Sequence, residues 1–341
     1  MNACMVAVVG DGIFGSLLTY YLGRSHVTTH WYTNSTQRKF SSSLASGGLV
    51  RSYVPDKNTI KHAAWSLKYY WRWSPNYWNI GSITTPYHTD SRNVDFIRRH
   101  YPEFTLRPAS TFLPSTFQVY PKVGAIYERT AGFVDAAEEL KRLYREAQSS
   151  QYVTILPKAD AVSLDNSRAT VSSTKGTAEY SHIYIAAGAA TLSLCRWINP
   201  DDYFLKRISY AVFKFPEAYS TFGLPCILDE SEDYWFRPMP EMGANHALAG
   251  YGRTMRPPSV FPAQTYDREY GDAVRERLKC TLPLLESSHL CYTVDSADIY
   301  RTTTDAPSIL RNNLVTALTG FSGGGFKLAP SYAHLLTASL R

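Results

Sequence analysis

The first residues of the chain whose spacing indicates chemistry are three glycines. They form the pattern GxGxxG in GDGIFG (residues 10–15), after an apolar run, MVAVVG, and before a helix expected over residues 13–22. In this pattern the glycines allow a tight turn, close approach of backbone amides to a pyrophosphate, and close packing of helix on strand. The start of the helix then presents N–H groups to the phosphates. We predict dinucleotide binding, which the order strand, glycines, helix favours over a purely structural turn.

The end of the next expected strand departs from the usual dinucleotide-binding pattern. That pattern continues with an acidic residue, which binds the ribose hydroxyls. Here the strand expected over residues 27–32 leads into Thr33 and Asn34. Both side chains can hydrogen-bond a hydroxyl, so we predict that they take the place of the acid.

Two later segments favour FAD over NAD. Residues 182–187 (HIYIAA) indicate a buried strand that ends in small residues, where a nucleotide can pass close to the backbone. Near the C-terminus, GFSGGGFK (residues 320–327) follows an expected strand and opens an expected helix. Backbone N–H groups at such a helix start can stabilise negative charge on a reduced flavin. A flexible glycine turn is the alternative, and it does not account for Lys327.

Composition and charge argue against other classes of protein. The chain is 44% hydrophobic and 19% charged, which is typical of a folded globular protein. No run of about 18 apolar residues and no signal peptide is present, so we predict no membrane association and a cytoplasmic location. The net charge of +6 is scattered, without the clustered basic face that binding to nucleic acid requires.

The five cysteines are odd in number and widely spread, which indicates reduced thiols. The grouping of Cys280, His289 and Cys291 lacks a second ligand pair at a usable spacing. We therefore predict no metal site.

The order of expected elements predicts two interleaved domains in an α/β (α+β two-domain) fold. A Rossmann-like FAD-binding domain would comprise residues 1–55, 132–200 and 293–341. A mixed, β-rich substrate-binding domain would be inserted as residues 56–131 and 201–292.

Five segments, in order along the chain, resemble the D-amino-acid oxidase superfamily, and in particular the branch with monomeric sarcosine oxidase and glycine oxidase. They are GDGIFG, SSSLASGGLVR (residues 41–51), and residues 132–147, 184–190 and 298–327. The resemblance covers the whole length, loosely in the two β-rich insertions. It implies FAD as the cofactor and a monomeric enzyme.

The resemblance also implies roles for particular residues. Ser42 and Ser43 match positions that approach the flavin. Arg51 and Lys327 match two cations that bind the substrate carboxylate, and Tyr300 matches a tyrosine that reaches it. Two cations converging on one site are costly without an anion, which the carboxylate supplies. Surface ion pairs are the alternative for the two cations.

Several family residues are replaced in this chain. Asp298 falls where sarcosine oxidase has the cysteine that links the flavin, so we predict non-covalent FAD. Leu248 falls where that enzyme has its oxygen-activating lysine, with His246 or Arg253 as alternatives, so rapid reaction with dioxygen is in doubt. The remaining departures are Leu44 for a histidine, Gly48 for an arginine, and Arg301, one residue away from the arginine of glycine oxidase.

We therefore predict an FAD-dependent oxidoreductase that oxidises the C–N bond of a small amine or amino acid bearing a carboxylate. The product would be an imine, and dioxygen or another acceptor would take the electrons, in a specialised biosynthetic pathway. The alternatives are a flavin monooxygenase-type enzyme reduced by NAD(P)H and a non-catalytic flavin-binding protein.

The predicted catalytic residues are Arg51, Tyr300 and Lys327. The predicted cofactor contacts are Gly10, Gly12, Ile13, Phe14, Gly15, Thr33, Asn34, Ser42, Ser43, Gly48, Arg51, Ala159, Ala187, Gly188, Gly323, Gly324, Gly325, Phe326 and Lys327.

Overall fold

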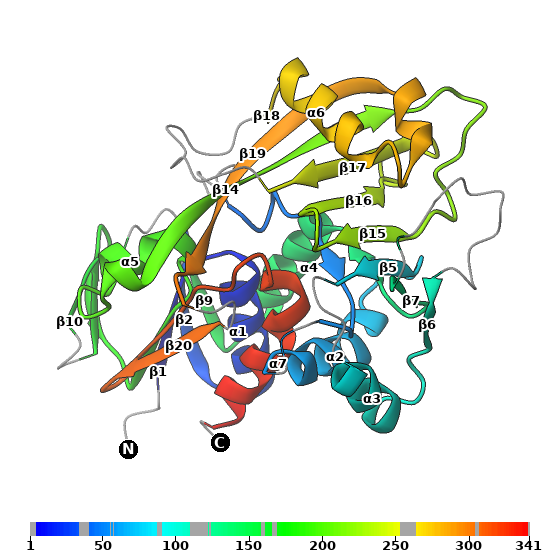
Figure 1. Ribbon diagram of the computed structural model, residues 1–341. Helices are drawn as coiled ribbons and strands as arrows, with labels where there is room; N and C mark the ends of the chain where they lie inside the picture. The colour runs from blue at the N-terminus through cyan, green and yellow to red at the C-terminus, as the bar shows by residue number, and fades with distance from the viewer. Residues whose placement is uncertain are drawn as a thin grey trace. The chain divides into compact units, whose positions relative to one another are not determined.

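The computed structural model divides the chain into two compact units (Figure 1). Unit 1 comprises Met1–Leu44, Ala136–Lys206 and Ala297–Arg341, and unit 2 comprises Ala45–Asp135 and Arg207–Ser296. The structure describes residues 5–33, 41–54, 56, 58–86, 91–109, 122, 124–157, 161–165, 169–252, 264–303 and 307–339. Three residues predicted above lie outside these ranges, namely Asn34, Ala159 and Arg253. The predicted α/β fold class is confirmed.

The division of the chain differs from the predicted domain boundaries in four places. Residues 45–55, 132–135 and 293–296 belong to unit 2, and residues 201–206 belong to unit 1. The first two segments contain β3 (Leu49–Val50) and β8 (Gly132–Val134), which pair with each other. Residues 203–206 and 293–296 lie in the long strands β14 (Tyr203–Lys214) and β19 (His289–Arg301), through which the boundary passes. The assignment of cofactor and substrate to the two domains stays a prediction.

A six-stranded sheet forms the centre of unit 1. In spatial order its strands are β20 (Ser308–Asn312), β21 (Val315–Thr319), β13 (His182–Ile185), β1 (Met5–Val9), β2 (Thr28–Thr33) and β9 (Val153–Pro157). All neighbouring pairs are parallel except the edge pair β20–β21. Residues 6–9 of β1 are all buried, as expected for a parallel strand with both faces covered.

Helices pack on this sheet. The helices of unit 1 are α1 (Ile13–Arg24), α4 (Ala136–Ser149), α5 (Thr191–Leu194) and α7 (Gly325–Ala338), with short 3₁₀ turns at Gly188–Ala190 and Pro200–Asp202. Helix α1 lies alongside both α7 and α4 (Figure 1). A separate antiparallel sheet contains β10 (Ala161–Asp165), β11 (Thr170–Ser173) and β12 (Gly176–Glu179).

Unit 2 is organised around a nine-stranded sheet. In spatial order its strands are β18 (Gln264–Thr265), β19 (His289–Arg301), β14 (Tyr203–Lys214), β17 (His246–Tyr251), β16 (Tyr234–Pro238), β15 (Cys226–Asp229), β5 (Ser82–Thr85), β7 (Ile126–Glu128) and β6 (Leu106–Pro108). A small sheet joins β3 and β8 to β4 (Tyr77–Trp78). The helices are α2 (Ile60–Tyr69), α3 (Ser91–His100) and α6 (Arg268–Leu278), with 3₁₀ turns at Trp71–Trp73 and Pro283–Ser287.

Helix α6 closes the main apolar core of unit 2. Asp267 caps its start by accepting a hydrogen bond from the Tyr270 N–H at 2.9 Å. Tyr270 is buried, and its hydroxyl donates to the Ser209 carbonyl at 2.6 Å. Phe213 and Phe236 of the sheet belong to the same buried cluster. The cap and the buried hydroxyl therefore fix the helix on β14.

The described residues show two further properties, one of the helices and one of the cysteines. Within them, no helix is long and apolar enough to cross a membrane. Four of the cysteines, Cys195, Cys226, Cys280 and Cys291, are free thiols.

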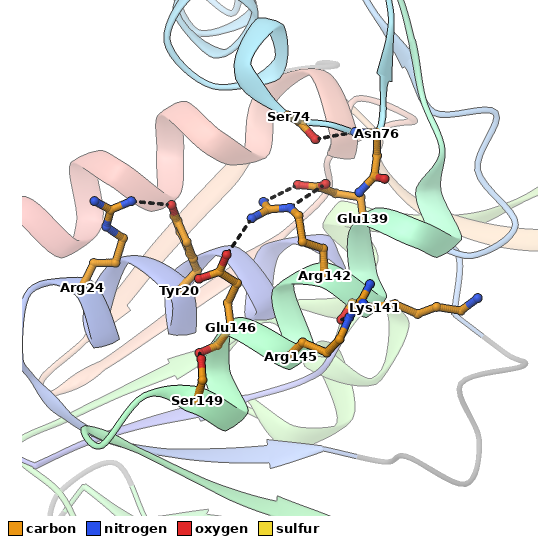
Figure 2. A network of polar contacts seen from close by, with 10 residues as sticks. All are labelled: Tyr20, Arg24, Ser74, Asn76, Glu139, Lys141, Arg142, Arg145, Glu146 and Ser149. Carbon is orange, nitrogen blue, oxygen red and sulfur yellow. Dashed lines mark hydrogen bonds and ion pairs between the residues drawn. The ribbon is translucent and has the colours of Figure 1, made fainter.

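A network of ion pairs on α4 includes a buried carboxylate (Figure 2). The Glu139 side chain is fully buried and accepts two hydrogen bonds from Arg142, from Nε at 3.1 Å and from Nη2 at 2.7 Å. Arg142 also pairs with Glu146 at 3.4 Å and lies 5.7 Å from the ring centroid of Tyr20 on α1. The guanidinium therefore joins the two helices and neutralises a charge that water does not reach.

We predict that Arg142→Met lowers the free energy of unfolding by about 3 kcal/mol, because the buried Glu139 carboxylate loses its bidentate partner. Arg145→Met is the matched control, since Arg145 is exposed on the same helix, and should change the free energy by less than about 0.5 kcal/mol. Urea unfolding of both variants measures the difference. Equal losses would show that the Arg142–Glu139 pair contributes nothing specific.

Candidate functional site

The turn between β1 and α1 depends on two glycines. Gly10 has a φ of 115°, and a Cβ there would overlap the carbonyl oxygen of Ala186 at the end of β13. A Cβ on Gly15 would overlap the carbonyl oxygen of Gly10. Helix α1 therefore starts against the ends of two neighbouring parallel strands. This is the geometry in which a dinucleotide-binding turn presents its N–H groups to a pyrophosphate.

Ser43 and Ser42 attach the segment after β2 to this turn. The Ser43 hydroxyl accepts a hydrogen bond from the Ile13 N–H at 3.0 Å, which satisfies one of the N–H groups that have no acceptor inside α1. The Ser42 hydroxyl donates to the Ala297 carbonyl of β19. Both serines, predicted as flavin contacts, are thus held at the helix start by polar contacts within unit 1.

The second glycine segment, Gly320–Lys327, lies beside the first. The rings of Phe14 and Phe321 are 3.9 Å apart between centroids. A Cβ on Gly325 would be in ordinary contact with Ile13, at 3.7 Å. The starts of α1 and α7 therefore lie together. Two helix N-termini, each with the positive end of its dipole, favour an anionic ligand between them.

Asp298 fastens the second glycine segment to β19. Its carboxylate accepts hydrogen bonds from the N–H groups of Gly323 at 2.7 Å and Ile299 at 2.8 Å. Burial raises the pKa of Asp298, while the same two hydrogen bonds act in the opposite direction. Sequence reasoning identified this residue only as the replacement for a cysteine, because its contact with Gly323 exists only once β19 and α7 are in place.

Tyr300, two residues further along β19, lies against the same loop. A Cβ on Gly323 would be 3.0 Å from the Tyr300 hydroxyl. The ring stacks on Phe204 with centroids 5.7 Å apart, and the Lys206 ammonium lies 5.3 Å from its centroid. The structure thus brings Tyr300 to the loop that carries Lys327, which is half-buried in the first turn of α7.

The other predicted contacts of unit 1 lie at the ends of strands. Thr33 ends β2 and is buried, and its hydroxyl has no hydrogen-bond partner among the described residues. Gly188 follows β13 with a φ of 57°, and no neighbouring atom lies within 4 Å of the place that a Cβ would occupy. An orphaned hydroxyl and open space beside the glycine turn both suit a bound nucleotide.

A cavity of about 140 Å³ opens at the same end of unit 1. It is lined by Asp11, Ser41, Leu44, Ala137, Leu140 and Lys141. Its polar residues lie in three of the segments singled out in the sequence, but none was predicted as a cofactor contact, because only the fold brings the three segments together. The cavity adjoins the dinucleotide turn through Asp11, so it is a further candidate for part of a nucleotide site.

Arg51 is a buried residue of unit 2. Its side chain is only 4% exposed and pairs with Glu230. The backbone next to it is held by the buried Glu128 carboxylate, which accepts from the N–H groups of Ser52 at 3.0 Å and Tyr53 at 3.1 Å. Burial raises the pKa of Glu128, and these hydrogen bonds oppose the shift. The position of Arg51 is therefore fixed from inside the unit.

The remaining substitutions in unit 2 have local structural explanations. Gly48, where relatives would have an arginine, has a φ of 65°, and a Cβ there would overlap the carbonyl oxygen of Val134. Leu248 is buried with Val212 and Met239, a place that would not hold a lone charge without cost. Burial and the charge of Lys214 lower the pKa of His246, which favours its neutral form.

Comparison with known proteins identifies the family of this chain. A family model described as FAD dependent oxidoreductase matches residues 5–339. The chain belongs to this family. The predicted resemblance is thereby confirmed, and with it FAD as the cofactor. No curated protein sequence matches the chain.

Solved structures with the same fold are similar over nearly the whole chain. L-proline dehydrogenase from P. horikoshii has a TM-score of 0.81 at 17% identity, covering 99% of this chain and 93% of its own. Iminodiacetate oxidase (IdaA) from Chelativorans sp. BNC1 has 0.77 at 18%, covering 98% and 95%. Glycine oxidase from Bacillus cereus ATCC 14579 has 0.76 at 16%, covering 99% and 96%. At these identities the likeness shows the fold alone.

The residues of unit 1 fit an FAD. The glycine turn leaves the backbone at Gly10 and Gly15 without side chains, two helix N-termini lie together, and the Thr33 hydroxyl has no protein partner among the described residues. The glycine turn suits the phosphates, the two helix N-termini suit an edge of the flavin, and the Thr33 hydroxyl suits a ribose. The protein is therefore an FAD-dependent oxidoreductase, and the residues of unit 1 suit this cofactor.

The raised pKa of Asp298 predicts a pH dependence of stability. A carboxyl whose pKa is higher in the folded than in the unfolded chain lowers the free energy of unfolding as the pH rises through its folded pKa. Asp298→Asn removes this effect. We expect the stability of the variant relative to wild type to increase as the pH rises above about 4, the ordinary pKa of an aspartate. Urea unfolding across that range measures it, and a difference that does not vary with pH would contradict the assignment.

Proposed function

We propose that the enzyme oxidises the C–N bond of a small amine or amino acid that bears a carboxylate, and passes the electrons to dioxygen or another acceptor. The observation that carries the proposal is the Gly320–Lys327 loop. Tyr300 lies against Gly323, and Lys327 stands in the first turn of α7. The Tyr300 phenol on β19 therefore lies against the loop that carries a cation and a helix N-terminus, and these are groups that bind a carboxylate.

The names of the structural neighbours support the same substrate class. Proline, glycine and iminodiacetate each have an amine nitrogen on the carbon that bears a carboxylate. One fold therefore serves dehydrogenase and oxidase chemistry on such compounds. Leu248 carries no charge, and the lowered pKa of His246 favours its neutral form, so neither residue supplies the positive charge of an oxygen-activating lysine. We therefore expect an acceptor other than dioxygen, or slow reaction with dioxygen.

The chain's own contribution to the reaction is binding and orientation. FAD, when bound, supplies the acceptor for a hydride equivalent from the carbon next to the nitrogen. We propose that the two glycine segments hold it without a covalent bond, since Asp298 is engaged with Gly323 and Ile299. Tyr300 and Lys327 of unit 1 would hold the substrate carboxylate and so fix the carbon that reacts. The family resemblance gives Arg51 of unit 2 the same role.

Anaerobic reduction tests this function. The purified yellow protein is mixed without oxygen with a panel of amino acids and N-alkyl amino acids, and flavin absorbance is followed. We expect one class to bleach the flavin without NAD(P)H. Lys327→Met and Arg51→Met should slow bleaching at low substrate by about 100-fold each, because each removes a charge-assisted contact to the carboxylate.

Rates of bleaching are compared only among variants that retain FAD. Lys175→Met is the control, because Lys175 is exposed on the β11–β12 turn. Reduction by NADPH with no response to any amine would instead support the monooxygenase-type alternative. A protein that binds FAD but is reduced by neither would be a non-catalytic flavoprotein.

A further inference from the structure

The Asp298 carboxylate of unit 1 is held by backbone groups and by no cation. It accepts hydrogen bonds from the N–H groups of Gly323 at 2.7 Å and Ile299 at 2.8 Å. No lysine or arginine among the described residues forms an ion pair with it. The buried Glu139 of the same unit, by contrast, binds Arg142 with both of its oxygens. When Asp298 is ionised, therefore, no described side chain neutralises its charge.

The loop that Asp298 binds leads directly into α7. Gly324 is the N-cap of this helix, so the N–H that Asp298 accepts belongs to the residue just before the cap. Ser322 and Gly323 both have positive φ, 48° and 73°, and the Ser322 N–H donates to the Ile299 carbonyl at 3.3 Å. These contacts hold the loop against β19. The charge of Asp298 is thereby fixed at the helix start that, together with α1, favours an anionic ligand.

The protonation of Asp298 depends on local balance rather than on other charges. The further charged or titratable groups on the elements around it are Tyr300 and Arg301 of β19, Lys206 of the neighbouring strand β14, Lys327 of α7 and Asp11 of the turn before α1. None of these described groups shifts the pKa of Asp298, which burial raises and the two hydrogen bonds lower. A new negative charge beside the loop would favour the neutral form of this carboxyl.

We infer that Asp298 takes up a proton when the flavin is reduced, and so offsets the negative charge that reduction adds at the start of α7. The hydride equivalent brings two electrons and one proton to the flavin, and the proton of Asp298 comes from solvent. Reduction by two electrons then takes up as many as two protons. The inference rests on the proposed position of the cofactor at the two helix starts. It makes Asp298 a residue that sets the flavin potential.

Linkage between the proton and the electrons fixes the direction of the effect. If reduction favours protonation of Asp298, then ionised Asp298 opposes reduction by the same free energy. At low pH the carboxyl is neutral in both states of the flavin and has no such effect. As the pH rises, the ionised carboxylate lowers the midpoint potential. A neutral amide at this position does not, so a variant that carries it should have the higher potential at high pH.

Asp298→Asn tests the inference in the FAD-containing enzyme, because an amide of the same size cannot take up the proton. Midpoint potentials are measured by anaerobic dithionite titration with redox dyes, from about pH 5 to about pH 9. We expect equal potentials for variant and wild type at the low end. With rising pH the equilibrium constant for reduction should become about 10-fold larger in the variant, which is about 30 mV for a two-electron couple.

Asp295→Asn is the matched control. Asp295 lies on the same strand, but its carboxylate pairs with Arg207. Its charge is already neutralised, so we expect any change in potential to be the same at every pH.

Infrared spectroscopy of the wild type gives a second test that needs no variant. The difference spectrum between reduced and oxidised enzyme is recorded at an electrode across the same pH range. We expect the C=O stretching band of a protonated carboxyl to appear on reduction, and to be absent from the spectrum of Asp298→Asn.

Two outcomes would overturn the inference. One is a difference in potential between Asp298→Asn and wild type that does not vary with pH, which would make Asp298 only a support for the loop. The other is a wild-type spectrum without the carboxyl band at any pH. Neither measurement uses an amine, so the proposed function is tested separately. Amines that bleach a flavin whose potential difference is constant sustain the function and refute the inference. A difference that grows with pH in an enzyme that no amine bleaches does the reverse.

Discussion

Close contact between backbones at the start of α1 is the constraint on which unit 1 depends. Gly10 and Gly15 have no side chains, and any Cβ at either position would overlap a carbonyl oxygen. Helix α1 can therefore begin directly at the ends of β1 and β13. Its position in turn places Phe14 against Phe321 and Ile13 beside Gly325, which brings the start of α7 alongside. Two helix N-termini therefore lie together, and we propose that the anionic cofactor binds there.

Two buried arginines of unit 2 differ in how the protein satisfies their nitrogens. Arg237 and Arg51 are both buried and both paired, so burial and pairing alone do not identify a ligand site. The difference lies in Nε and Nη1, which donate to backbone carbonyls in Arg237 but meet no acceptor among the described residues in Arg51. Natural proteins seldom leave such groups unsatisfied without a reason.

The sequence predicted the parts of the protein that depend on local pattern. The apolar run, glycines and helix after them identified the dinucleotide turn, because each requirement lies within a few adjacent residues. The fold class and the FAD-dependent family followed and are confirmed. Contacts between distant segments could not be predicted in this way. Asp298 meets Gly323, and Arg51 meets Glu230, only after separate strands have paired.

The structure also explains two residues that depart from the family pattern, Gly48 and Leu248. Gly48 is required by its own backbone, whose positive φ and contact with Val134 leave no room for a side chain. Leu248 belongs to an apolar cluster on β17. Neither fact is visible in the pattern of neighbouring residues, since both depend on the strands that pack against these positions.

The product of a single turnover tests the central claim most directly. The enzyme is mixed anaerobically with the amino acid that reduces its flavin, and the products are identified by mass spectrometry. The account predicts one equivalent of an imine, or of the carbonyl compound and amine that form on its hydrolysis, for each flavin reduced. A hydroxylated product that requires NAD(P)H and dioxygen would contradict it.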